Sequence, residues 1–218
     1  MKKGRTLTAI VFVLLSITTS AIARKSKPAA ADYFPLRVGD SWSYRNTSGD
    51  GEYSLKVLSE EKQVDGSIRY LLEKMAGVKI HSWFSKTSGW VLMHAERYPE
   101  HEGLEIKYDP PRQYLQNPLL PGAKWEWKGK DNTQTETQES NKIIRFERIT
   151  VPAGKFRAMK VVSRVSGAAT PIIRTYWYAE GVGLVKSTTD GGQIKYGWEL
   201  ADYSSRRRVK IGPKLPSS

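Results

Sequence analysis

Alternation of apolar and polar residues is the feature that most constrains the fold of this chain. The alternation is clearest at 194–200, and residues 53–57 and 104–108 repeat it. Within 194–200 the apolar positions are Ile194, Tyr196, Trp198 and Leu200, and Lys195 and Glu199 lie between them. Successive side chains of a β-strand point to opposite faces, so this period of two predicts strands with one buried face and one face exposed to solvent.

Turn signals separate these apolar runs at short intervals. Glycine-containing turns are expected at 48–51, 65–66, 88–89, 152–154 and 190–192. Between them the pattern predicts further strands at 67–74, 78–85, 89–96, 132–139, 142–150, 155–165, 171–178 and 182–188. Beyond the N-terminus, no long stretch of the sequence has a helical period.

Many short strands joined by tight turns predict an all-β fold, a large curved antiparallel meander. A single flat sheet with this many strands is unusual. We therefore expect the sheet to close into a barrel, a half-barrel or a two-layer clam. The sequence has no repeat of fixed period, which argues against a propeller.

The N-terminus has the pattern of a secretory signal peptide, which we assign to residues 1–23. Lys2, Lys3 and Arg5 precede an apolar run at 7–17, and Ala21 and Ala23 supply the small residues of a cleavage site. No later segment is long and apolar enough to span a membrane, so we expect a periplasmic or extracellular protein. The absence of cysteine excludes disulfides, thiol catalysis and a lipid-modified N-terminal cysteine.

The formal net charge of +13 lies mostly at the ends of the chain. Residues 24–32 and 204–218 form basic tails that we expect to be flexible, whereas residues 28–205 hold 24 basic and 22 acidic residues. A nucleic-acid-binding domain concentrates basic charge on its folded body, so we predict no nucleic-acid partner. Residues 33–203 are expected to form one β domain. The tails are either solvated or in contact with an anionic surface.

Residues 109–122 combine prolines with apolar side chains, which fits neither an ordinary strand nor a solvated loop. We expect this segment to be a loop that plugs one end of the sheet or forms a lid over a cavity. In the lid interpretation the candidate binding residues are Tyr114, Leu115, Leu119 and Leu120.

Five groups of residues occur in an order that resembles a widespread group of uncharacterised secreted bacterial proteins. They are Tyr33-Phe34-Pro35-Leu36 with Gly39-Asp40-Ser41-Trp42-Ser43-Tyr44, Pro118-Leu119 with Gly122-Ala123-Lys124-Trp125, Val151-Pro152-Ala153-Gly154-Lys155-Phe156, Trp177-Tyr178-Ala179-Glu180-Gly181-Val182-Gly183-Leu184-Val185-Lys186, and Glu199-Leu200. The resemblance implies an exported all-β protein and no particular activity. The architecture alone is also similar to the curved sheets of periplasmic lipoprotein carriers.

The sequence contains no recognisable catalytic motif. Residues 39–41 are Gly-Asp-Ser, as in some esterases, but no histidine follows His101 to serve as the base that such a serine needs. His81 and His94 would lie opposite each other if 86–89 were the turn of a hairpin, and they are weak candidates for a metal site. We predict no cofactor and assign no catalytic residue.

Three function classes therefore stay open. The leading hypothesis is a non-catalytic envelope protein whose curved sheet binds a lipid, another apolar ligand or an envelope protein. A glycan-binding module is the alternative, and it requires exposed coplanar aromatic rings. A hydrolase with an unrecognised site is the third.

Overall fold

The computed structural model describes residues 31–166 and 171–205. The predicted signal peptide (1–23), residues 24–30 of the predicted N-terminal tail and residues 206–218 of the C-terminal tail lie outside them. The strands are β1 (Ser41–Asn46), β2 (Glu52–Lys62), β3 (Ile68–Met75), β4 (Lys79–Lys86), β5 (Trp90–Tyr98), β6 (Leu104–Gln116), β7 (Lys124–Asp131), β8 (Glu136–Val151), β9 (Gly154–Ser166), β10 (Ile172–Ala179), β11 (Gly183–Asp190) and β12 (Lys195–Ser204).

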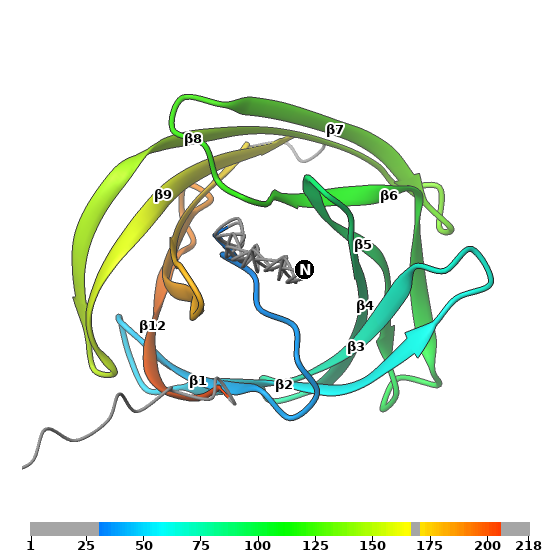
Figure 1. Ribbon diagram of the computed structural model, residues 1–218, viewed down its shortest axis with the longest axis horizontal. Helices are drawn as coiled ribbons and strands as arrows, with labels where there is room; N and C mark the ends of the chain where they lie inside the picture. Colours follow the sequence, from blue (N-terminus) through cyan, green and yellow to red (C-terminus); the bar gives the residue numbers. More distant parts are fainter. Residues whose placement is uncertain (1–30, 167–170, 206–218) are drawn as a thin grey trace, which may run out of the picture.

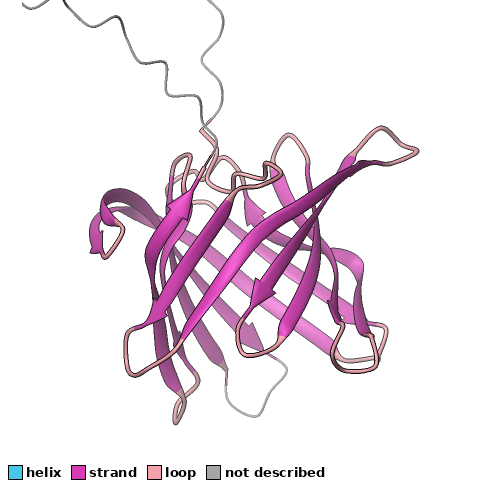
Figure 2. Cartoon of the chain, turned by 90° about the horizontal axis from the view of Figure 1, so that it is seen from below, coloured by secondary structure: helices cyan, strands magenta, loops and turns pink. Residues whose placement is uncertain are grey.

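The strands form a closed antiparallel barrel in which each strand pairs with its neighbours in sequence (Figure 1). Closure comes from β1 and β12, where Trp42 lies opposite Tyr203. The strands tilt across the wall, and the described part of the chain contains no helix (Figure 2). No membrane-spanning helix is found in that part of the chain. The predicted all-β meander is thus confirmed, and of its three possible closures the structure has the barrel.

The predicted alternation also sets which side chains face inward. On β2, Tyr53 and Val57 are buried while Ser54 and Lys56 are exposed. On β7, Trp125 and Trp127 are buried on either side of the exposed Glu126.

The secondary structure predicted for two regions, 132–150 and 109–116, was wrong. Residues 132–135 form a turn, and a single long strand, β8, replaces the strands predicted at 132–139 and 142–150. The inward-facing residues Glu139 and Asn141 are polar, so the apolar alternation is lost there and one strand looked like two. Residues 109–116 are not a loop either, because they form the second half of β6.

One end of the barrel carries the connections at 63–67, 87–89, 117–123, 152–153 and 180–182, together with the start of β1 and the end of β12. We call it the strap end, because residues 31–40, the strap, cross the interior of the barrel there (Figure 1). The opposite end carries the connections at 47–51, 76–78, 99–103, 132–135 and 191–194.

Polar contacts fix the strap to strands on both sides of the barrel. Lys86, at the end of β4, places its Nζ 2.7 and 2.8 Å from the two carboxylate oxygens of Asp32. Asn117 donates to Asp32 over 2.9 Å and accepts from the backbone N–H of Tyr33 over 2.9 Å. Across the barrel, the N–H of Gly181 donates to the carbonyl of Asp32 over 2.7 Å. The strap therefore bridges β4, the β6–β7 connection and the β10–β11 turn.

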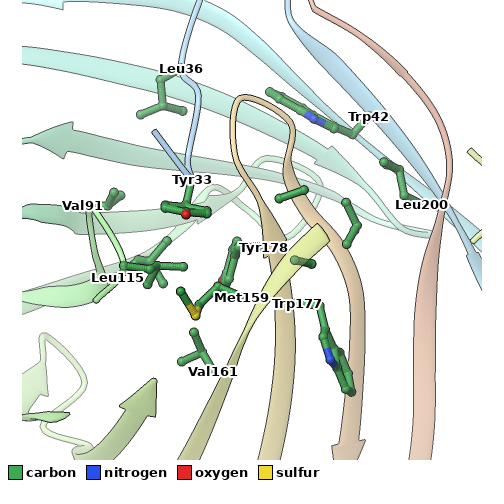
Figure 3. Close-up of a cluster of buried hydrophobic side chains, with 14 of the residues drawn as sticks. Tyr33, Leu36, Trp42, Val91, Leu115, Met159, Val161, Trp177, Tyr178 and Leu200 are labelled. Carbon is green, nitrogen blue, oxygen red and sulfur yellow. The ribbon is translucent and has the colours of Figure 1, made fainter. Parts of the chain in front are cut away.

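The buried apolar core lies at the strap end, beneath the strap (Figure 3). Tyr33 of the strap lies beside Leu115, Met159 and Tyr178 of the wall, and these four residues and Leu36 of the strap are at most 7% exposed (Figure 3). The glycine-containing turn at 181–183 closely approaches the strap here, because a Cβ on Gly183 would lie 3.4 Å from Pro35 Cδ. The strap and the core beneath it therefore close this end of the barrel.

Candidate functional site

A cavity of about 470 Å³ occupies the barrel between the strap-end core and the opposite end. Its lining comes from the strap and from eight strands, β2–β6 and β10–β12. Towards the opposite end the lining includes Tyr98, Thr189 and Tyr196, which lie next to the turns there, and Tyr196 is 38% exposed. We call this side of the cavity its mouth.

The floor of the cavity is apolar and aromatic. Phe34 of the strap, Phe84 of β4 and Tyr114 of β6 pack against one another with ring centroids 5.2–5.5 Å apart. Leu72 of β3 and Met93 of β5 extend this surface. Aromatic and aliphatic side chains at these spacings give an apolar ligand a preformed contact surface.

Charged side chains form a belt between the floor and the mouth. The belt consists of Lys74 on β3, Glu96 on β5, Arg112 on β6 and Arg174 on β10. The phenol of Tyr108 donates a 2.9 Å hydrogen bond to Glu96. The cavity therefore combines an apolar floor with a charged middle section, as a site for an amphipathic molecule requires.

Arg112 is already neutralised by a buried carboxylate beside the cavity. Its Nη2 lies 2.6 Å from Glu139 Oε1, and its Nε lies 3.1 Å from Oε2. Burial opposes the charge of Arg112, but the carboxylate of Glu139 outweighs that effect and raises the pKa of Arg112 above its usual value. Arg112 thus belongs to a fixed ion pair in the wall.

Lys74 and Arg174 differ from Arg112, because neither forms an ion pair with a described residue. Lys74 is directed over the ring of Tyr53, with Nζ 4.7 Å from the ring centroid. Burial lowers the pKa of Lys74, Glu96 opposes that shift, and the positive charge of Arg174 adds to it. The two cations therefore act on each other electrostatically inside one cavity.

The tyrosines of the cavity are desolvated. Burial raises the pKa of Tyr114 to about 12, and burial together with the carboxylate of Glu96 raises the pKa of Tyr108. At neutral pH these phenols are un-ionised. Tyr114 can therefore donate or accept a hydrogen bond at a ligand, whereas Tyr108 already donates to Glu96 and can only accept another.

The structure does not bring the four predicted lid residues together. Tyr114 lies on β6 and lines the cavity, while Leu115 beside it is 1% exposed in the core. Leu119 is 3% exposed in the strap-end core, and Leu120 is 55% exposed at the surface. No lid is formed by the described residues of this segment, and the role of these residues in binding stays a prediction.

His81 and His94 do not face each other, contrary to the sequence expectation. The β4–β5 turn pairs Lys86 with Val91, and a bulge after Trp83 then places His81 opposite Arg97. His81 contacts Glu73 over 3.2 Å, whereas His94 contacts Ser85 over 2.8 Å. Within the described residues no group of three metal-ligating side chains is found.

The exposed aromatic platform that a surface glycan site requires is missing from the described residues. Each of the seven tryptophans is buried or half-buried, and Tyr196 is the one exposed aromatic side chain of the part described. Catalysis by a pair of carboxylates also lacks support there, because Glu96 is the single carboxylate among the cavity-lining residues described.

Sequence reasoning missed the belt, although the sequence contains a signal for it. Lys74 lies two residues from Leu72 on β3, and Arg174 lies two and four residues from Tyr176 and Tyr178 on β10, so each cation shares a face with apolar or aromatic side chains. A cation at an apolar position of a strand predicts a charge that faces inward. The usual expectation places the charged residues of a strand on its solvent-exposed face, and that expectation hides such a signal.

These features define a class of protein: a closed meander barrel with a strap across one end and an amphipathic cavity behind it. Residues 109–191 match the DUF3108-like family model. This match confirms the predicted resemblance to an uncharacterised group, because the family has no assigned activity. No curated protein matches the chain.

Two solved structures are similar over 80% of this chain. One is a candidate lipoprotein from Parabacteroides distasonis, with 16% identity, a TM-score of 0.48 and 99% of its own chain covered. The other is a candidate exported protein with a YmcC-like fold from Bacteroides fragilis, with 13% identity, a TM-score of 0.49 and 100% of its chain covered. These values are too low to transfer a function.

Proposed function

We propose that this chain is an exported bacterial envelope protein that binds a small amphipathic ligand inside its barrel. The cavity of about 470 Å³ carries this proposal. Protein interiors are close-packed, with few voids larger than one water molecule. Small-molecule sites have volumes of about 300 to 1,000 Å³ and combine apolar walls with a few polar groups.

The strap supports a role in binding rather than conduction. It closes one end of the barrel through the hydrogen bonds of Asp32 and through Phe34, which also lines the floor. A barrel closed at one end holds a ligand and does not pass it through. The cavity is also too small for a folded partner, so among the predicted occupants we favour the small ligand.

Export is supported by the signal-peptide pattern of residues 1–23. The proposal places the protein in the periplasm or outside the cell, where an amphipathic molecule needs protection from water. A cavity that shields the apolar part of a ligand supplies this protection without any chemical step.

Two measurements test the proposal. Native mass spectrometry of the mature protein should show a co-purified small molecule that leaves after denaturation. The uncharged probe N-phenylnaphthylamine should also become fluorescent on binding, because the floor excludes water.

A matched pair of variants locates the binding. Ser82 lines the cavity, whereas Ser54 is exposed on β2, so both receive the same change to phenylalanine. Ser82→Phe should weaken probe binding by filling the cavity, and Ser54→Phe should leave it unchanged. Equal binding by the wild-type protein and Ser82→Phe, or no binding at all, would contradict the proposal.

A further inference from the structure

We propose that the ligand carries an anionic headgroup, a carboxylate or a phosphate monoester, which Lys74 and Arg174 bind together in the belt. This inference rests on the proposed function and adds the chemical class of the ligand. It is carried by the position of the two cations in the cavity and by the absence, among the described residues, of an ion pair that includes either of them.

The position of the belt defines how an amphiphile would lie. On β3, Leu72 lies on the strap side of Lys74, and on β10, Tyr178 lies on the strap side of Arg174. The apolar floor is therefore deeper than the two cations on both walls. A ligand with its tail on the floor places its headgroup at the height of Lys74 and Arg174.

The charges of the lining leave an excess of positive charge. Arg112 is compensated by Glu139, with which it makes two contacts of 2.6 and 3.1 Å. Lys74 and Arg174 then share one carboxylate, Glu96, which already accepts a hydrogen bond from Tyr108. No ion pair in the part of the chain described includes Lys74 or Arg174.

Two cations that share one carboxylate leave one positive charge in excess in a partly enclosed cavity, and a bound anion would offset it. The lowered pKa of Lys74 is consistent with this excess, because burial lowers that pKa most, Glu96 opposes the shift, and the charge of Arg174 lowers it further. An anion between the two side chains would replace repulsion with two charge-assisted hydrogen bonds. The un-ionised phenol of Tyr114 could then donate to one of its remaining oxygens.

The competing possibility is a cationic amphiphile bound to Glu96. Such a headgroup would share the cavity with Lys74 and Arg174, whose positive charges would repel it. An uncharged headgroup would leave the excess positive charge of the lining without compensation. The balance of charge in the lining therefore favours the anion.

The test compares amphiphiles that share a tail and differ in headgroup. Dodecanoate, dodecyl phosphate, dodecanol and dodecyltrimethylammonium are used, below the concentrations at which they form micelles, to displace N-phenylnaphthylamine from the mature protein. We expect both anions to bind at least tenfold more tightly than dodecanol, since a hydrogen bond to a charged group contributes about 1.5 to 3 kcal/mol. The cationic amphiphile should bind most weakly.

Acetate and inorganic phosphate separate a headgroup from a free anion. The inference expects neither to displace the probe, because they lack the tail that contacts the floor. Lengthening the tail from octanoate to dodecanoate should strengthen binding about fourfold per CH₂ group while the floor accommodates it. If inorganic phosphate displaced the probe as strongly as dodecyl phosphate, the ligand would be a free anion, and the proposal of an amphiphile with an anionic headgroup would be overturned.

Variants then assign the headgroup to the two cations. Lys74→Met and Arg174→Met should each lower dodecanoate affinity about tenfold and leave dodecanol affinity nearly unchanged. Lys56→Met, an exposed lysine of β2, serves as the control and should change neither. Retained probe binding shows that a variant is folded. If a methionine variant does not fold, Lys74→Gln or Arg174→Gln takes its place.

The outcomes separate the inference from the function on which it rests. Probe binding with equal affinity for dodecanoate and dodecanol would refute the anionic headgroup and leave the cavity function intact. No binding of the probe or of any amphiphile would refute both.

Discussion

Removal of Arg112 should destabilise the barrel strongly, because it leaves a buried carboxylate without its partner. The side chains of Arg112 and Glu139 are 15% and 5% exposed, and both carboxylate oxygens of Glu139 contact the guanidinium. Arg112→Met keeps the apolar length of the side chain and removes its charge. The perturbation therefore acts on the ion pair with little change in volume.

The expected magnitude follows from this burial. Breaking a buried ion pair from one side costs about 3 to 5 kcal/mol. Asn141 and Ser163 lie beside the pair, and the Nδ2 of Asn141 has no hydrogen-bond partner in the described part of the chain. This amide can donate to Glu139 once Arg112 is gone, so we expect the lower end of that range, about 3 kcal/mol.

Urea denaturation followed by tryptophan fluorescence measures the effect, with an unchanged m-value as the sign that two-state behaviour is kept. The control is the double variant Arg112→Met/Glu139→Leu, which removes both charges and should recover stability to within about 1 kcal/mol of the wild type. A loss below about 1 kcal/mol for Arg112→Met, or a double variant as unstable as the single one, would refute the reasoning.

Further predictions concern the strap and the packing of β7. Lys86→Met should cost about 1 kcal/mol in urea denaturation, a modest value because the Asp32–Lys86 pair is partly exposed. Burial opposes the ionisation of Asp32, but the hydrogen bonds and charge of Lys86, together with Asn117, lower the pKa of Asp32. The stability that ionised Asp32 contributes is therefore present above pH 3.8 and is lost as the pH falls through the lowered pKa. Acid titration of the melting temperature should show that loss in the wild type and a flatter profile in Lys86→Met. Gly129→Ala should cost about 1 to 3 kcal/mol, because its Cβ would overlap Trp127, whereas Gly49→Ala, with open space around it, should be close to neutral.

Much of the fold could be predicted because period-two patterns survive on most strands. Tyr53 and Val57 on β2, and Trp125 and Trp127 on β7, alternate with exposed residues as expected. Closure could not be predicted from such local patterns, because a strand at the edge of an open sheet and a strand in a barrel alternate in the same way. Closure depends on the pairing of β1 with β12, which are far apart in the sequence.

Bulges explain some of the remaining differences. A bulge adds a residue to one strand, so the inward parity changes part of the way along it. This happens in β8 between Ile143 and Phe146, and in the β4–β5 pair after Trp83, where it contributes to the separation of His81 from His94. The sequence contains no equally clear signal for an extra residue, because both parities can be occupied by apolar side chains there.

The candidate site was harder to predict than the fold for a physical reason. A charge at an apolar strand position is costly in a filled core and tolerated beside an open cavity. Lys74 and Arg174 therefore indicate a binding site only once the barrel is known to contain a cavity beside them. The four residues predicted from the proline-rich segment were chosen for being apolar, and that criterion selects core residues such as Leu115 and Leu119 as readily as a binding surface.

The residues that carry the resemblance lie mainly at the strap end and explain its architecture. Trp42 donates to the carbonyl of Val182 over 2.7 Å, and Tyr44 donates to that of Leu184 over 2.9 Å, so two of the sequence groups bind each other. None of the belt residues belongs to these groups. A protein that shares the groups is expected to share the strap end and its core. If the proposed headgroup site is correct, the ligand of each such protein depends on its own residues at the positions of Lys74 and Arg174.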